Sequence, residues 1–343
     1  MVKFRYEVCL FYIFKSLGTI PMNCDFNQIG KSKNVSNRPF TYSKFGIIYN
    51  ILLIIIITIS SYLIMQVNYF YAINDRYYSE RLNDSVYQII LAYSAVFILV
   101  VYSVYQRTFL EIGNTFGDIR VWFSIRGINM FEYWMHDVKK IFSINLFLMV
   151  IWIATMPVIW SMYLEYFIAL SISNFVINFV AIQYSLVLKL IQRLFECINM
   201  DLLMLVKPNV SVNSKIQFRV NNLQERYIFA GKLSQDLSSF YSPLILVCII
   251  SSFLTCILSL YYLVKPVIVR HNDLPTIVLV NCGVQLICSG FLLIIIAKTA
   301  GDAVVESKRT AEIICENMRN FSHLQLINHM VKVLKFYRFL KRK

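Results

Sequence analysis

The side chains of this sequence that are best placed to do chemistry are aromatic and uncharged polar groups inside long apolar runs. Nine candidates share this setting: Tyr93, Trp152, Met156, Trp160, Asn174, Asn178, Tyr262, Asn281 and Gln285. The two tryptophans and the methionine between them recur every four residues, so they lie on one face of a helix. The next two asparagines are one helical turn apart, as are the last two amides. Apolar walls with a few placed polar groups are typical of a pocket for a small organic molecule.

The same residues also fit a structural role. Polar side chains join helices to one another inside membranes, and Trp and Tyr anchor helix ends at the membrane surface. For each residue taken alone, this packing role is the simpler interpretation. The pocket hypothesis rests on the convergence of several runs, because the candidates in the last four runs all fall near the middle or in the outer half of their runs.

Ionisable side chains are missing from the apolar runs. Such groups are costly inside a membrane and are usually functional there, so their absence argues against proton pumps, ion-coupled transporters and intramembrane proteases. The four histidines are dispersed outside the runs without metal-ligand spacing. The sequence has no glycine-rich loop of the kind that binds phosphates. It therefore predicts no enzymatic activity, no cofactor and no metal site.

Six apolar runs must position the candidate residues. Of the 343 residues 58% are hydrophobic and only 15% are charged, whereas about a quarter are charged in an average soluble domain. The runs are Phe45–Ile64, Val86–Tyr105, Ile141–Leu164, Tyr166–Leu188, Leu244–Val264 and Leu274–Ala297. Each is long enough for a helix to cross a bilayer, and none shows the alternation of a barrel strand. We predict an all-α, polytopic transmembrane helix bundle with six spans.

Basic residues predict the orientation of this bundle. Segments on one predicted side carry 29 of the 33 Lys and Arg residues, and those on the other side carry four. Because positive charge stays in the cytosol, both termini should be cytoplasmic. The net charge of +14 then reflects topology and attraction to anionic lipid, not binding to nucleic acid. We expect a multi-pass plasma-membrane protein with a cytoplasmic tail (residues 1–44), a bundle (45–297) and a C-terminal cytoplasmic helix with a basic tail (298–343).

Amphipathic segments outside the runs predict further helices. Val8–Phe14 is too short for a signal peptide or a span, and we expect a short helix lying against the bundle. The fourth run continues as a helix past Leu188, Phe218–Phe240 precedes the fifth run, and Asp302–Met318 follows the sixth. These three should extend from the membrane into the cytosol. They could pack together, pack against copies of themselves, or be ordinary solvated loop helices.

Several short motifs resemble those of insect gustatory receptors. Ile13–Pro21 contains Leu-Gly-Thr-Ile-Pro and resembles the Leu-Gly-x-x-Pro segment that opens those receptors. Ala303–Ile314 looks like the helix after their sixth span. Phe321–His329 is similar to their Phe-Ser-x-Gln-Leu element with one extra residue, and Val331–Val333 fits its continuation. The predicted topology, with long inner and short outer loops, also matches.

This resemblance implies a ligand-gated, non-selective cation channel. Its subunits would form a homo- or hetero-tetramer in membrane lipid and respond to a small organic tastant. The family's ligand pocket lies in the outer half of the bundle between the second and sixth spans, and the cytoplasmic helix extensions make the contacts between subunits.

One expected feature of that family is missing from the sequence. The family has a pore-lining seventh span with a Thr-Tyr…Gln-Phe motif, whereas this chain shows no seventh apolar run and ends in the basic, aromatic segment Leu334–Lys343. Such a segment is expected to lie on the inner leaflet. A truncated, non-conducting or modulatory subunit is therefore an alternative function, and an odorant receptor or a transporter is a further one. A G-protein-coupled receptor conflicts with the predicted cytoplasmic N-terminus.

Overall fold

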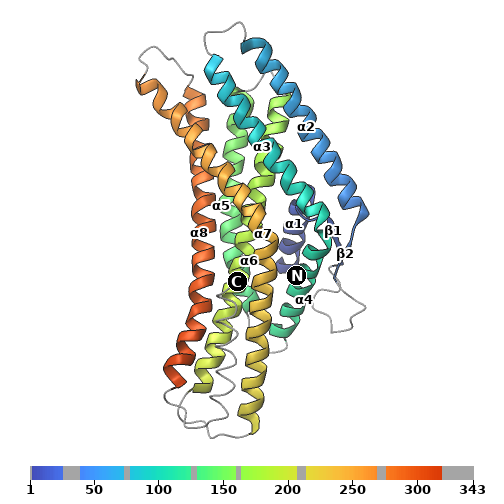
Figure 1. Ribbon diagram of the computed structural model, residues 1–343, viewed down its shortest axis with the longest axis vertical. Helices are drawn as coiled ribbons and strands as arrows, with labels where there is room; N and C mark the ends of the chain where they lie inside the picture. Colours follow the sequence, from blue (N-terminus) through green and yellow to red (C-terminus); the bar gives the residue numbers. More distant parts are fainter. Residues whose placement is uncertain are drawn as a thin grey trace.

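The computed structural model describes residues 2–25, 39–72, 78–124, 130–159, 164–206, 214–268 and 276–318. Helices dominate these residues, which confirms the all-α fold class (Figure 1). The elements are α1 (Val2–Ser16), β1 (Met22–Cys24), β2 (Phe40–Tyr42), α2 (Lys44–Ala72), α3 (Tyr78–Val104), α4 (Gln106–Ser124), α5 (Met130–Ile159), α6 (Leu164–Val206), α7 (Ser214–Ile268) and α8 (Thr276–Met318).

Six helices in the described part of the chain are long and apolar enough to cross a membrane, as predicted. Their candidate spans are Lys44–Gln66, Ser85–Val104, Trp134–Thr155, Leu170–Met204, Asn222–Ile268 and Val278–Ile313. They belong to α2, α3, α5, α6, α7 and α8, and each overlaps one of the six apolar runs. The bounds agree closely in α2 and α3, whereas the candidate spans of α6, α7 and α8 reach further into the charged regions than the predicted runs. The protein is thus a membrane protein with six candidate spans.

The helix extensions are continuous with their spans. Helices α6 and α8 have 43 residues each and α7 has 55, whereas about 20 residues suffice to cross a bilayer. The surplus of all three lies at the same end of the molecule, beside α4 (Figure 1). We call this the extension end, and we call the opposite end, where α2 meets α3 and α7 meets α8, the loop end. That the extension end faces the cytosol stays a prediction from charge.

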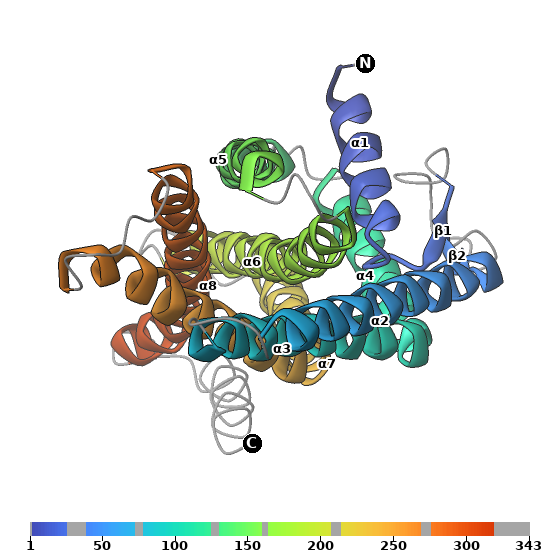
Figure 2. The ribbon, with the colours of Figure 1, turned by 90° about the horizontal axis from the view of Figure 1, so that it is seen from above.

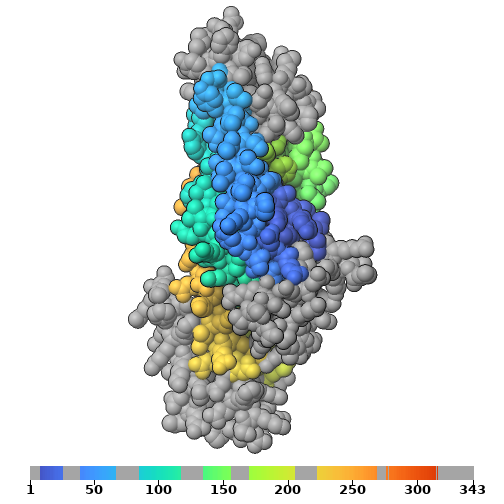
Figure 3. Space-filling model, turned by 90° about the vertical axis from the view of Figure 1, so that its right-hand side faces the viewer, coloured from blue at the N-terminus to red at the C-terminus, as the bar shows by residue number. Residues whose placement is uncertain are grey.

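Helix α6 forms the centre of the bundle. Seen from above, it lies between α5 on one side and α2 and α3 on the other (Figure 2). In its apolar 18-residue stretch 72% of the residues are buried, compared with 22% in that of α2. Helix α2 occupies the surface of one face (Figure 3), where it exposes apolar side chains such as Ile48, Leu52 and Ile59. An exposed apolar face on a span suits contact with lipid.

Helix α1 is the short helix that we predicted to lie against the bundle. It begins at Val2, six residues before the apolar stretch Val8–Phe14 on which the prediction was based. Leu10, Phe11 and Phe14 are buried, and the ring of Phe14 meets Phe179 of α6 edge-on at 5.8 Å. Sequence analysis did not predict the antiparallel pair of β1 and β2 or helix α4. The two strands have three residues each, which is too short to produce a periodic signal.

The Leu-Gly-Thr-Ile-Pro motif forms a tight turn after α1. Gly18 has a φ of 74°, in the left-handed region that favours glycine. The side chain of Asn50 donates to the Gly18 carbonyl at 3.0 Å, and Gln106 donates to the carbonyl of Pro21. Because both amides are buried, they satisfy backbone groups that would otherwise be left without partners inside the bundle.

Substitution of Gly18 by alanine should destabilise the protein. A Cβ there would overlap Asn50 Oδ1, would lie 2.7 Å from Leu99 Cδ2, and would force a side chain into the left-handed region. We expect a loss of about 2 kcal/mol in unfolding free energy, seen as a lower melting temperature of the detergent-solubilised chain. Gly301→Ala is the matched control, since its Cβ would meet nothing within 4 Å and helix propensity favours it by about 0.5–1 kcal/mol. Equal melting temperatures for the two variants would contradict this role of Gly18.

Candidate ligand site and the extension network

Polar side chains from four helices meet toward the loop end of the bundle. Asn281 of α8 donates through Nδ2 to Thr155 Oγ1 of α5 at 2.7 Å. Gln285, one turn further along α8, donates through Nε2 to the Tyr87 hydroxyl of α3 at 2.8 Å. That hydroxyl also lies 3.0 Å from Thr255 Oγ1 of α7. These five residues, which we call the loop-end polar cluster, connect α3, α5, α7 and α8.

The α5–α6 interface beside this cluster contains three more of the predicted residues. Trp152 is 3% exposed, and its ring meets Phe175 of α6 edge-on at 6.3 Å. Asn178 lies one turn after Phe175 and one turn after Asn174, and both asparagines are buried. Asn174 Nδ2 donates to the Leu170 carbonyl at 3.0 Å and Asn178 Nδ2 donates to the Asn174 carbonyl at 2.8 Å. The amide nitrogens are therefore bound to their own helix.

Two buried polar atoms at this interface have no hydrogen-bond partner among the residues that the structure describes. They are the donor Trp152 Nε1 and the acceptor Asn178 Oδ1. A buried donor or acceptor without a partner costs about 1–3 kcal/mol. Trp152 Nε1 can donate a hydrogen bond and Asn178 Oδ1 can accept one, so each atom would be satisfied by a polar ligand group that reaches it.

The remaining four candidate residues are not seen to join the loop-end polar cluster or the α5–α6 interface beside it. Tyr93 is 72% exposed on α3 and lies apart from the buried cluster. Tyr262 is half-buried near the end of α7, with its ring 5.2 Å from that of Tyr261. Met156 belongs to α5, but its side chain is outside the described residues, as is the whole of Trp160. The predicted stripe Trp152–Met156–Trp160 can therefore be followed only at its first residue.

Tyr87 and Thr155 were not among the predicted site residues, nor was Thr255. Tyr87 is one of 22 tyrosines and lies at the start of its apolar run, where an aromatic residue is usually an interfacial anchor. Only the crossing of α3 with α7 and α8 reveals its role. The sequence holds one weak signal for this role. Tyr87 and Ser94 are seven residues apart, so their hydroxyls lie on the same face of α3. Ser94 Oγ also contacts α7, at 2.8 Å from Ser251 Oγ.

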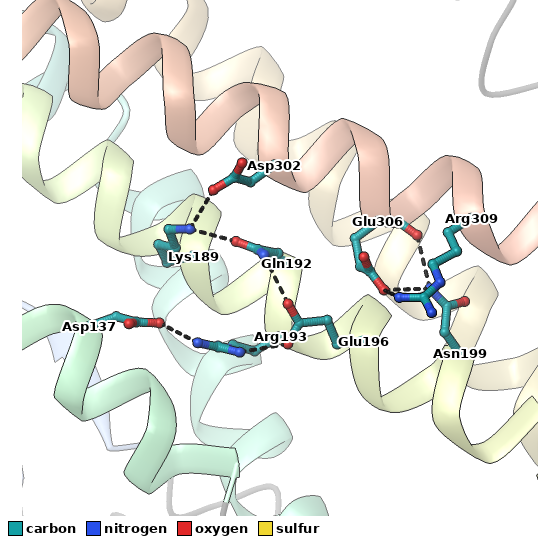
Figure 4. A network of polar contacts seen from close by, with 9 residues as sticks. All are labelled: Asp137, Lys189, Gln192, Arg193, Glu196, Asn199, Asp302, Glu306 and Arg309. Carbon is teal, nitrogen blue, oxygen red and sulfur yellow. Dashed lines mark hydrogen bonds and ion pairs between the residues drawn. The ribbon is translucent and has the colours of Figure 1, made fainter.

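A second polar network, which we call the extension network, joins the helices at the other end (Figure 4). Lys189 of α6 pairs with Asp302 of α8 at 2.7 Å. Arg193, one turn further along α6, pairs with Asp137 of α5 at 2.7 Å and with Glu196 at 2.8 Å. These ion pairs are partly buried and bind three helices together where their apolar runs end.

Three further pairs of residues continue the extension network. Asn199 of α6 donates to both the carbonyl and the carboxylate of Glu306 on α8, and it accepts a bond of 2.6 Å from Thr310. Arg226 of α7, which is 8% exposed, pairs with Asp201 of α6 at 2.7 Å. The extensions of α6, α7 and α8 therefore pack together, as one of the three sequence-based alternatives predicted.

The two networks differ in chemical composition. Among the residues that the structure describes, no three or more His, Cys, Asp or Glu side chains lie together so that they could hold a metal ion. The loop-end polar cluster consists of neutral hydroxyls and amides, whereas the extension network combines ion pairs with the neutral side chains of Asn199 and Thr310. The arrangement is suited to binding at one end and to holding helices in register at the other.

Comparison with known proteins adds one finding. A family model described as 7tm Chemosensory receptor matches residues 8–333, which is nearly the whole chain. A search of curated proteins found no match.

Proposed function

Since this chain belongs to the 7tm chemosensory receptor family, we propose that it is a gustatory receptor subunit of a ligand-gated, non-selective cation channel in the plasma membrane. Membership of the family supports a chemoreceptor role. The taste specificity and the channel activity are our proposal, and they follow the resemblance of the sequence motifs to insect gustatory receptors.

The observation that carries this proposal is the loop-end polar cluster beside two buried polar atoms that have no hydrogen-bond partner among the described residues. Asn281 and Gln285 connect one helix to two others, while Trp152 Nε1 and Asn178 Oδ1 remain available. A ligand bound among these helices contacts groups that already determine how the helices sit against one another. Binding can then favour one arrangement of the helices over another, because its contacts differ between the two. The absence of charge in the cluster favours a neutral tastant.

The proposed tetramer is supported by apolar side chains exposed on the extensions. Met200 and Met204 of α6 are 50% and 65% exposed, and Val304 and Val305 of α8 are 52% and 64% exposed. These residues lie beyond or near the end of the apolar runs, beside the charged extension network. Exposed apolar side chains beside charged groups mark contacts with other chains or with the membrane, and on the proposed topology we assign these four to contacts between subunits. The partners would be copies of this chain or related subunits.

The proposal is tested by recording tastant-evoked current in cells that express this chain alone or with a second subunit of the same family. A panel of neutral and charged tastants is applied to both sets of cells. We expect neutral tastants to evoke a cation current that cells with the second subunit alone do not show. If currents with and without this chain have the same ligand dependence, the proposal is wrong.

A further inference from the structure

Helix α7 changes direction about midway along its length (Figure 1). The helix contains two prolines, Pro243 and Pro266. Pro243 lies near the middle of the helix, whereas Pro266 is two residues from its end. Proline has no N–H with which to bond the carbonyl four residues earlier, here that of Ser239, and its ring clashes with that carbonyl. Sharp bends in helices are almost always found at such positions, so we attribute the bend to Pro243.

Aromatic rings surround α7 at this bend. Phe240 stacks on Phe109 of α4 with ring centroids 5.2 Å apart, and Tyr102 of α3 meets both rings edge-on at 5.2 and 5.5 Å. Tyr102 and Tyr241 are fully buried. The Tyr102 hydroxyl donates to Gln183 Oε1 of α6 at 2.7 Å. The bend therefore packs against α3, α4 and α6, the last through the rings of Tyr241 and Tyr184 at 5.5 Å.

The two arms of α7 are bound to different partners. On the arm toward the loop end, Ser251 meets Ser94 of α3 at 2.8 Å and Thr255 meets Tyr87 at 3.0 Å. Tyr87 in turn accepts the hydrogen bond from Gln285. On the other arm, Arg226 is paired with Asp201 of α6. One arm thus belongs to the loop-end polar cluster and the other to the extension network.

We propose that Pro243 is a joint in α7, and that Tyr87 is the positioning residue that couples the angle of this joint to the loop-end polar cluster. This inference rests on the proposed function, which identifies the signal as the binding of a ligand at the loop-end polar cluster. Such a ligand competes for the hydrogen bond between Gln285 and Tyr87. When Tyr87 releases Thr255, the arm toward the loop end loses one of the hydrogen bonds that hold it to α3 and keeps the one between Ser251 and Ser94, so that it turns more freely about the aromatic rings. The missing hydrogen bond at Pro243 makes this rotation possible without breaking a regular turn of helix.

Hydrogen–deuterium exchange of the full chain in lipid nanodiscs tests the joint without a ligand or a current. In the wild-type chain we expect backbone amides at 240–247 to exchange about tenfold faster than those at 230–237 and 251–258, which corresponds to a weakening of the neighbouring helical bonds by about 1.4 kcal/mol. Pro243→Ala restores the bond and should remove this difference. Equal protection of all three segments in the wild type would overturn the proposal.

The coupling is tested with a matched pair of variants on α3. Tyr87→Phe removes only the hydroxyl that bonds Gln285 and Thr255, and Tyr93→Phe makes the same change at a residue that is 72% exposed. We expect Tyr87→Phe to raise exchange at 240–247 by roughly threefold and Tyr93→Phe to leave it unchanged. If Tyr87→Phe affects only the amides around residues 87 and 255, Tyr87 supports local packing and does not position the joint. Because these outcomes need no tastant, they are independent of whether the channel proposal holds.

Discussion

Asn178→Leu should reduce the sensitivity of the receptor to its tastant by tenfold or more without lowering the stability of the protein. Asn178 Oδ1 is buried and has no hydrogen-bond partner in the described part of the chain, and its Nδ2 bonds only a carbonyl of its own helix. Leucine fills a similar volume and removes an acceptor whose burial costs about 1–3 kcal/mol. The melting temperature should therefore stay the same or rise. A ligand that donates to Oδ1 loses that bond, and a lost hydrogen bond to a binding site costs about tenfold in affinity.

Asn281→Leu is the informative control for this prediction. Its amide already donates to Thr155 of α5, so the substitution removes a bond between helices and should lower the melting temperature. The two asparagines are thus expected to differ in the sign of their effect on stability. A fall in melting temperature for Asn178→Leu with unchanged tastant sensitivity would assign Asn178 to helix packing.

Arg226→Met should cause the largest loss of stability among substitutions in the extension network, about 3 kcal/mol in unfolding free energy. Arg226 is 8% exposed, and it faces Asp201 at 2.7 Å. Removal of the guanidinium leaves a partly buried carboxylate without its counter-charge, which costs more than the pair contributes. The double variant Arg226→Met with Asp201→Leu removes both charges and should recover most of the stability. Thermal unfolding of the solubilised chain measures all three proteins.

Arg309→Met provides the comparison within the same network. The Arg309 side chain is 56% exposed, and it reaches Glu306 at 3.4 Å on its own helix. An exposed pair of this kind contributes about 0.5 kcal/mol or less, so the variant should unfold at nearly the wild-type temperature. A loss as large as that of Arg226→Met would show that burial does not determine the strength of these pairs.

The spans were predictable because lipid imposes a simple requirement on sequence. A run of about 20 residues without charge has few alternatives to a transmembrane helix, and the first run, Phe45–Ile64, differs by only one or two residues at each end from the candidate span Lys44–Gln66. The continuation of α6 past Leu188 was also predictable, because its apolar side chains keep a helical period into the charged region.

The contacts between spans were much less predictable. An asparagine inside an apolar run is equally compatible with a bond to another helix, as at Asn281, and with a bond to its own helix, as at Asn174. Which of the two occurs depends on the rotation of each helix and on its neighbours, and these are properties of the whole bundle. For the same reason the partners of Lys189 and Arg193 on other helices could not be deduced from the sequence.

The turn after α1 shows that a sequence motif can be recognised without revealing its structural role. The sequence Leu-Gly-Thr-Ile-Pro resembles a family segment, but the resemblance does not explain why a glycine is needed. The reason is the approach of Asn50 from α2 and Leu99 from α3 to Gly18, residues that are 32 and 81 positions away in the chain. The physical role of such a motif emerges only when the elements around it are in place.

A structure of this chain in complex with a second subunit of the family and an active tastant would decide whether the proposed ligand site is correct. We predict that the tastant lies between α5, α6 and α8, with its polar group within hydrogen-bond distance of Trp152 Nε1 and Asn178 Oδ1. We also predict that the bond between Gln285 and Tyr87 differs from that in the ligand-free protein. A tastant bound at the extension end, or on the lipid-facing surface of α2, would contradict the account.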